Sequence, residues 1–268
     1  MAIPVSICET VSIKVQAAVR YGMVHGLTPI SPLYIVNEYP KSGGTWVGQM
    51  VSQAMGLPFP RNCYPAFRSS FMHGHYLRPW GMNNVLVVWR DGRDMMVSWY
   101  YHTLFLHQSG FNARLVNELR SHLKFEDYND IHSNLPAFIE HCFTRYRPMN
   151  FSWPAFVDNW HGRKNVTFVR YEDLRSKGTL ELQRIVKELS GRELSQARAH
   201  KIIEEFSFAK QAGRQPGEEN KNSFLRKGIV GDWQNQFTKE AREVFAKYSG
   251  NSLIKLGYEQ NHQWVYAP

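Results

Sequence analysis

The sequence lacks the features that define several large classes of protein. Its three cysteines, Cys8, Cys63 and Cys142, form neither a C-x-x-C pair nor an even set. This spacing argues against a disulfide scaffold or a zinc site and favours a reducing, cytoplasmic location. No apolar run is long enough to span a bilayer. Glu9 and Lys14 interrupt the apolar N-terminal stretch, so we expect no signal peptide.

Acidic residues are missing from one long stretch. Between Tyr39 and Arg90 there is no Asp or Glu; Glu38 precedes this gap and Asp91 ends it. Two interpretations are open. The gap is either chance composition in a partly buried region, or a wall that faces a polyanion, which a carboxylate would repel.

Positive charge is in excess but is not concentrated. The net charge is +9, and the densest basic spots are pairs such as Arg163-Lys164 and Arg226-Lys227. A nucleic-acid-binding protein usually concentrates its charge along one face or arm. Dispersed charge suits a pocket for a small polyanion at least as well, so we expect a small-molecule ligand and no nucleic acid.

The residues near position 41 predict a P-loop-like anion-binding loop. Residues 33–36 form a short apolar run, typical of a buried strand, and residues 46–55 have the pattern of a helix. Between them lie Lys41, Ser42, Gly43, Gly44 and Thr45. Glycines let backbone N–H groups approach an anion, a helix N-terminus adds partial positive charge, and the lysine adds a full charge. The acid-free stretch begins here, which favours the polyanion interpretation.

Strands that alternate with helices predict a single α/β domain over residues 1–268, with a mostly parallel central sheet flanked by helices. Further strands are expected at residues 69–76, 84–90 and 165–171. Helices are expected at residues 10–24, 95–106, 180–189 (capped by Thr179), 195–206 and 238–248, with Pro136 between helices and Ser152 as a cap. Residues 211–223 are predicted to form a mobile loop.

A second anion site is predicted where the strand at residues 84–90 ends. Arg90 and Arg93 supply charge there, and Ser98 lies about one helical turn beyond the start of the next helix. A salt bridge at the helix start is the alternative.

Four segments resemble, in the same order, the motifs of the cytosolic sulfotransferases. Residues 40–46 (P-K-S-G-G-T-W) resemble the 5′-phosphosulfate loop of that family, usually P-K-S-G-T-T-W. Arg90 followed by Ser98 resembles its 3′-phosphate segment. Residues 226–238 (R-K-G-I-V-G-D-W-Q-N-Q-F-T) are similar to R-K-G-x-x-G-D-W-K-N-x-F-T, and residues 171–174 to Y-E-D-L/M. Four matches in order make chance an unsatisfactory explanation.

The resemblance implies transfer of a sulfuryl group from 3′-phosphoadenosine 5′-phosphosulfate (PAPS) to a hydroxyl or amine of a small-molecule or carbohydrate acceptor, without a metal ion. Lys41 would neutralise the bridging oxygen, and the N–H groups of residues 42–45 would hold the 5′-phosphate. Arg90, Ser98 and Arg226 would clamp the 3′-phosphate. Other donor-binding positions implied by the motifs are Trp46, Tyr171, Phe208, Phe224, Leu225, Lys227 and Gly228.

The family takes the proton of the acceptor with the histidine of a K-T-H motif. The matching residues are His73, Gly74 and His75, which places His75 on the base and His73 on the lysine. The acid-free stretch also leaves histidine as the ordinary base of this wall. The implied catalytic set is therefore His75, Lys41, Ser98 and His73, with the two histidines sharing roles or Lys41 acting alone on the leaving group.

Other features leave alternatives open. Gly44 replaces a threonine of the motif, and Gln234 and Lys239 alter a segment that forms a dimer contact in the family, so the oligomeric state is open. A P-loop kinase or NTPase competes, but its lysine follows the glycines rather than preceding them. The acceptor pocket is expected beside His75, walled by aromatic candidates: Phe67, Phe71, Tyr76, Trp80, Phe105, Phe143 and Tyr146.

Overall fold

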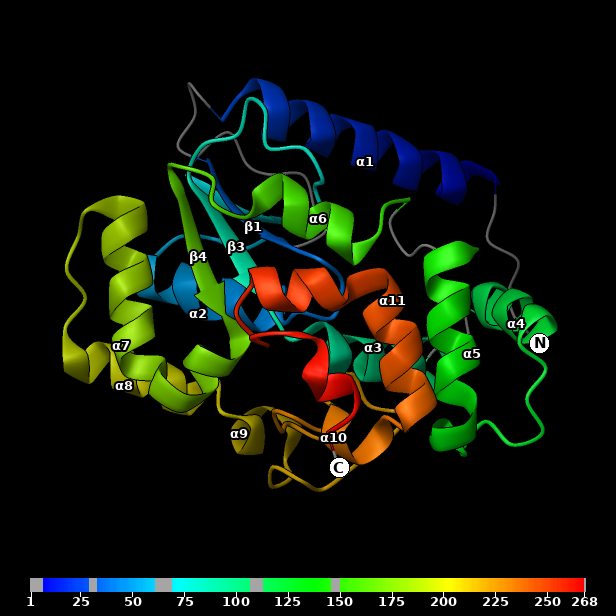
Figure 1. Ribbon diagram of the computed structural model, residues 1–268. Coiled ribbons are helices and arrows are strands. Elements are labelled where there is room, and N and C mark those ends of the chain that lie inside the picture. The colour runs from blue at the N-terminus through cyan, green and yellow to red at the C-terminus, as the bar shows by residue number, and fades with distance from the viewer. Residues whose placement is uncertain (1–6, 29–32, 61–68, 107–112, 146–149, 268) are drawn as a thin grey trace. The chain divides into compact units, whose positions relative to one another are not determined.

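The computed structural model describes residues 7–28, 33–60, 69–106, 113–145 and 150–267 (Figure 1). Contacts within the chain divide it into two compact units, and each is described by itself. The sheet unit contains the described parts of residues 7–90 and 162–214. The helical unit contains those of residues 91–161 and 215–267. The single domain expected over residues 1–268 stays a prediction.

Four parallel strands form the sheet, in the order β2-β1-β3-β4. They are β1 (Leu33–Glu38), β2 (Ser70–Gly74), β3 (Val85–Trp89) and β4 (Val166–Arg170). Val36 pairs with His73 on one side of β1 and with Leu86 on the other. The carboxyl ends of parallel strands lie at one edge of a sheet. The residues that follow β1, β2 and β3 therefore emerge together, and the expected parallel α/β fold is confirmed.

The helices of the sheet unit are α1 (Ile7–Gly26), α2 (Gly44–Met55), α7 (Tyr171–Ser190), α8 (Gln196–Glu205) and α9 (Phe208–Ala212) (Figure 1). Of these, α2 and α7 contact the strands, α8 packs on α2 and α7, and α9 packs on α8. The core joins strand residues such as Val36 and Leu86 to helix residues such as Val51, Leu182 and Ile202, all of which are buried. A strand such as β3, apolar at every position, is expected where both faces of a parallel sheet are covered.

The start of α7 differs from the prediction. The helix begins at Tyr171, directly after β4, so Thr179 lies inside it and does not cap it. Glu172 and Asp173 occupy the first turn, where negative charge is favourable near a helix N-terminus. Lys177 has non-helical angles, φ −128° and ψ 33°, and this kink lies close to the predicted start. The predicted helix thus corresponds to the part of α7 beyond the kink.

The helical unit surrounds an aromatic core. Its elements are α3 (Gly92–Tyr101), η1 (His102–Leu106), α4 (Ala113–His122), α5 (Ile131–Thr144), α6 (Trp153–Trp160), α10 (Trp233–Gln236), α11 (Lys239–Lys255) and η2 (His262–Val265). The ring of Phe245 packs against those of Phe143, Trp153, Phe237 and Trp264. Gly92 permits this packing, because a Cβ there would lie 2.7 Å from Trp153.

Of two predictions about helix limits in this unit, one is confirmed and one is wrong. Ser152 caps α6 as predicted, since its Oγ accepts a hydrogen bond from the N–H of Ala155. Pro136, predicted as a break, lies inside α5. That helix persists because residues such as Leu135 and Phe138 are fully buried, and burial outweighs the lost backbone hydrogen bond.

The structure also bears on the cysteines, on membrane-spanning helices and on the loop after α9. Cys142 is a buried free thiol in α5, and burial raises its pKa; Cys63 lies outside the described residues. None of the helices in the described ranges combines the length and the apolar composition that a bilayer-spanning segment needs. Residues 215–231 contain turns and no helix or strand, and their backbone hydrogen bonds include one from Gly217 N–H to the Lys227 carbonyl.

Candidate active site

The loop after β1 turns through two residues with positive φ. Lys41 has φ 73° and Gly43 has φ 95°, and Gly43 caps the N-terminus of α2. A lysine in the left-handed region carries backbone strain, which persists only where the surrounding structure holds it and which is frequent at functional sites. A Cβ on Gly43 would lie 2.8 Å from the ring of Tyr171. This close approach therefore requires glycine.

Arg90 joins the loop from the end of β3. Its Nη1 donates a 2.8 Å hydrogen bond to the carbonyl of Lys41, and its guanidinium lies 4.7 Å from the ring centroid of Tyr171. The Trp46 ring packs edge-on to Tyr171, and its indole N–H donates to the Phe206 carbonyl at 2.7 Å. The structure thus brings together predicted donor-binding residues that follow β1, β3 and β4.

Phe208 belongs to the same unit. It begins α9, two residues beyond the carbonyl that Trp46 contacts. Its ring is buried, and the guanidinium of Arg214 lies 5.5 Å from the ring centroid. Its predicted adenine contact stays a prediction.

Glu38, the last residue of β1, lies against the loop. Its Oε2 accepts a 2.5 Å hydrogen bond from the N–H of Gly44, and its Oε1 lies 2.9 Å from Nε2 of His73. The residue is only 4% exposed. A Cβ on Gly44 would stand 2.6 Å from the carboxyl carbon of Glu38. The glycine that replaces the threonine of the motif is therefore required by this carboxylate.

The environment of Glu38 keeps it ionised. Burial alone would raise its pKa, because it disfavours the charged form. The hydrogen bond and charge of His73, the charge of His75 and the N–H of Gly44 act in the opposite direction and outweigh burial. The pKa of Glu38 therefore falls below its ordinary value.

The two histidines have different partners. His73 lies on β2 and contacts the Glu38 carboxylate, whereas Nδ1 of His75 lies 2.9 Å from the Glu38 backbone carbonyl. A carbonyl can only accept, so Nδ1 of His75 donates in this contact, and in the neutral imidazole Nε2 is the nitrogen that has no proton. In that tautomer Nε2 is the atom that would take a proton from a substrate.

A buried amide fixes the chain beside these histidines. Oδ1 of Asn37 accepts from the N–H of Tyr76 at 2.7 Å, and its Nδ2 donates to the Tyr76 carbonyl at 3.0 Å. Gly74 stands between the histidines, where a Cβ would lie 2.0 Å from the Tyr76 ring. This position therefore has no room for the threonine of K-T-H while that ring stays in place.

Two expectations about the loop are corrected. The wall predicted to lack carboxylates contains Glu38, whose charge lies against Gly44. Two of the four backbone donors predicted to hold a phosphate are also engaged within the protein, since Ser42 N–H donates to the Tyr39 carbonyl and Gly44 N–H to Glu38. The sequence carried two signals for this arrangement: an acidic residue at the strand end and a glycine in place of a threonine.

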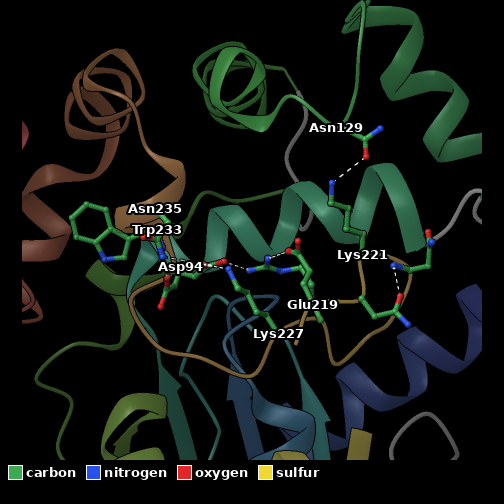
Figure 2. A network of polar contacts seen from close by, with 11 residues as sticks. Asp94, Asn129, Glu219, Lys221, Lys227, Trp233 and Asn235 are labelled. Carbon is green, nitrogen blue, oxygen red and sulfur yellow. Dashed lines mark hydrogen bonds and ion pairs between the residues drawn. The ribbon is translucent and has the colours of Figure 1, made fainter. Parts of the chain in front are cut away.

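In the helical unit, a polar network fixes the loop before α10 (Figure 2). Asp94 of α3 accepts hydrogen bonds from the backbone N–H groups of Gly231 at 2.7 Å and Trp233 at 2.9 Å. Farther along, Lys221 donates to the side chain of Asn129 at 3.1 Å. Figure 2 shows that these contacts tie residues distant in sequence to α3 and to the segment before α5.

The basic residues of this loop are paired with carboxylates. Arg226 bonds to Glu219 and, at 2.5 Å, to Asp232; Lys227 bonds to Asp232 at 2.8 Å. Burial alone would raise the pKa of Asp232, but the hydrogen bonds and charges of Lys227 and Arg226 outweigh it and lower the pKa. Phe224, Leu225 and Gly228 belong to the same segment, and Ser98 lies on α3. All of these residues belong to the helical unit, so their joining Arg90 in one clamp stays a prediction.

Arg93 does not supply charge to an anion, contrary to expectation. It is 2% exposed and bonds to Asp91 at 2.7 Å and to Glu259 at 2.5 Å. Its guanidinium also lies 3.7 Å from the ring centroid of Trp233. Arg93 is thus a structural cation of the aromatic core. Among the aromatic residues predicted to wall the acceptor pocket, Phe67 and Tyr146 lie outside the described residues.

Comparisons with known proteins agree with these motifs. A family model described as a sulfotransferase domain matches residues 65–257. Sulfotransferase 1C2 of Oryctolagus cuniculus is 23% identical over 261 residues, covering 86% of each chain. Sulfotransferase 1B1 of Canis lupus familiaris is 24% identical over 261 residues, covering 79% of this chain and 80% of that protein.

Two solved structures share the fold. Mouse sulfotransferase SULT7A1, complexed with PAP, superposes with a TM-score of 0.60 at 19% identity, covering 89% of this chain and 92% of that one. Retinol dehydratase, in complex with androsterone and the inactive cofactor PAP, gives a TM-score of 0.59 at 16% identity, covering 86% and 83%.

The contact between Glu38 and Gly44 predicts non-additive substitutions. Gly44→Ala should destabilise the protein by about 1–3 kcal/mol, because the new methyl group overpacks against the buried carboxyl. In a Glu38→Ala background that cost should vanish, as measured by a double-mutant cycle of chemical denaturation. Gly22→Ala, in α1 with open space around it, is the matched control. Additive effects would contradict the contact.

The pairing of Asp232 predicts a pH dependence of stability. Its pKa is lowered in the folded state, so its contribution is complete above the unfolded value of about 3.9 and is lost as pH falls through the folded value. The gap in thermal midpoint between wild type and Asp232→Asn should be constant above about pH 5 and shrink in more acidic buffer. A gap that does not change with pH would show that the carboxylate charge is unimportant.

Proposed function

The chain belongs to the sulfotransferase family, and we propose that it takes the sulfuryl group from PAPS and passes it to a hydroxyl or amine of a small-molecule or carbohydrate acceptor. The observation that carries the proposal is the convergence of Lys41, Arg90 and Tyr171 on the glycine loop, with His75 at the end of the adjacent strand. Both superposed structures are complexes with PAP, the desulfated form of this donor.

Lys41 and the loop would bind the phosphosulfate end of the donor. Sulfuryl transfer, like phosphoryl transfer, depends on charge stabilisation and in-line positioning more than on covalent chemistry. Lys41 would neutralise the bridging oxygen as its bond to sulfur breaks. The N-terminus of α2 adds partial positive charge for the 5′-phosphate. For Gly44 N–H to contribute, the phosphate must take the place of the Glu38 carboxylate.

Arg90 would hold the 3′-phosphate together with Ser98 and Arg226. A guanidinium presents a planar fork that matches two phosphate oxygens, which suits this role. One side of the Arg90 fork already contacts the Lys41 carbonyl, so the residue would link the two ends of the donor site. Arg226 would exchange a carboxylate partner for the phosphate or bind it alongside one.

His75 would act as the general base. Its Nε2 accepts the proton of the acceptor as the oxygen or nitrogen attacks sulfur, and the Glu38 carbonyl holds the resulting imidazolium in place through Nδ1–H. His73, bonded to the Glu38 carboxylate, would stand in for the lysine of the family motif. Adenosine 3′,5′-bisphosphate then leaves with its new negative charge beside Lys41.

We expect transfer to need no metal ion, which separates this proposal from a magnesium-dependent P-loop NTPase. Activity that persists in the presence of a chelator would support sulfuryl transfer. Activity that is lost when the chelator removes magnesium would support a P-loop NTPase. A screen of phenols, alcohols, amines and sugars with labelled PAPS tests the proposal directly and identifies the acceptor.

Replacing Arg90 tests the donor site. Arg90→Ala should weaken binding of adenosine 3′,5′-bisphosphate by roughly 10- to 100-fold, because hydrogen bonds to charged groups contribute about 1.5–3 kcal/mol. Calorimetric titration measures the affinity, and an unchanged thermal midpoint would show that the fold is intact. Lys164→Ala, an exposed site with the same loss of charge, is the control. Unaltered affinity in Arg90→Ala would refute its assignment.

Replacing the histidines tests the base. His75→Ala should reduce turnover by about 10²- to 10⁴-fold while leaving the affinity for adenosine 3′,5′-bisphosphate unchanged, since the residue acts on the acceptor proton. The measurement is initial rate with labelled PAPS and the best acceptor from the screen. If His73→Ala loses turnover and His75→Ala keeps it, then His73 is the base and the assignment to His75 is wrong by two residues.

A further inference from the structure

Three side chains of the sheet unit present metal-binding atoms to one point. Glu38, His73 and His75 each offer one ligand atom, and these atoms all lie within 4.8 Å of one another. Two imidazole nitrogens and a carboxylate oxygen are a donor set that zinc and other late first-row divalent ions accept. We infer that this cluster binds one such ion and that the bound ion inhibits the enzyme; the inhibition rests on the proposed function.

The spacing of the ligand atoms is close to what zinc requires. In a tetrahedral site with bonds of about 2.0–2.2 Å, neighbouring ligand atoms are about 3.3 Å apart. Oε1 of Glu38 and Nε2 of His73 already lie 2.9 Å apart. The ring centroids of His73 and His75 are 5.1 Å apart and the rings are inclined by 77°, so both can face a common point. All three ligand atoms lie within 4.8 Å of one another, so the ion would have to draw His75 inward by up to about 1.5 Å to complete three bonds.

Two hydrogen bonds orient these ligands before an ion arrives. The N–H of Gly44 holds Oε2 of Glu38, which leaves Oε1 toward the histidines. The Glu38 carbonyl holds Nδ1 of His75, which leaves Nε2 as the ligand atom. Metal-binding histidines and carboxylates commonly have such outer partners, and these partners fix the ligand geometry and strengthen binding.

The charge of the cluster also favours a cation. Glu38 is a buried carboxylate, and its charge needs a compensating partner, which His73 now supplies by a hydrogen bond. A divalent ion would bond to Oε1 and to Nε2 of His73 in place of the proton between them. In a neutral imidazole that proton moves to Nδ1 of His73, so metal binding at these two atoms needs no net proton release. No electron transfer or other reactant is needed.

The position of the site decides its effect. An ion on Nε2 of His75 occupies the electron pair that must accept the proton of the acceptor. The metal-bound enzyme is therefore inactive, and a chelator restores activity. This is opposite to a metal-dependent enzyme, in which a chelator removes activity.

The binding test uses the full-length chain, stripped of metal with a chelator and then dialysed. Titration calorimetry with zinc chloride should show one strong site. His73→Gln and Glu38→Gln should each weaken zinc binding at least tenfold, whereas His200→Gln, at an exposed position on α8 of the same unit, should leave it unchanged. Cobalt(II) bound to the wild type should show the intense visible absorption of a four- or five-coordinate ion.

Equal zinc affinity in wild type and His73→Gln would overturn the site, and so would a cobalt spectrum matching the hydrated ion. The cobalt arm needs no variant, so a cluster variant that fails to fold leaves the proposal falsifiable. In a transfer assay with labelled PAPS, zinc should inhibit and a chelator should restore the rate; strong binding without inhibition would overturn the regulatory part. If the protein does not use PAPS, the binding arm still decides the metal site.

Discussion

One buried carboxylate connects the anion-binding loop to the strand that carries the histidines. Glu38 contacts the loop through Gly44 N–H and the neighbouring strand through His73, while its own backbone carbonyl orients His75. A buried charge is tolerated only when its surroundings compensate it, so these contacts constrain one another. The absence of a side chain at Gly44, the tautomer of His75 and the partner of His73 all follow from where this carboxylate lies.

The sheet could be predicted from the sequence because its signals are local. The apolar runs at residues 84–90 and 165–171 correspond to Val85–Trp89 and Val166–Arg170. Helix limits were predicted less well where distant contacts decide them. Pro136 reads as a break, yet the buried face of α5 keeps the helix continuous. The predicted helix at residues 180–189 covers only the part of α7 beyond the kink at Lys177, whereas the helix begins at Tyr171.

The residues of the candidate site also divide into those that local sequence predicts and those that depend on distant contacts. Lys41, Gly43 and Arg90 lie in motifs whose chemistry can be inferred from the sequence alone, and the structure brings them together. Glu38 could not be assigned, because its role depends on the loop folding back over the strand end. The charge pattern alone does not distinguish Arg90 from Arg93, because both arginines are close to the end of β3; in the structure Arg93 is paired with Asp91 and packs in the aromatic core.

The sheet unit is assembled from two separated pieces of chain. β3 pairs with β4 along its whole length, yet residues 91–161 are synthesised between them. Until β4 leaves the ribosome, the nascent chain can hold only β2, β1 and β3, and the apolar V-L-V-V-W edge of β3 has no neighbour. An unpaired apolar edge is a template for intermolecular pairing, and contacts between distant residues form slowly. Biosynthesis therefore has a vulnerable interval before the last strand arrives.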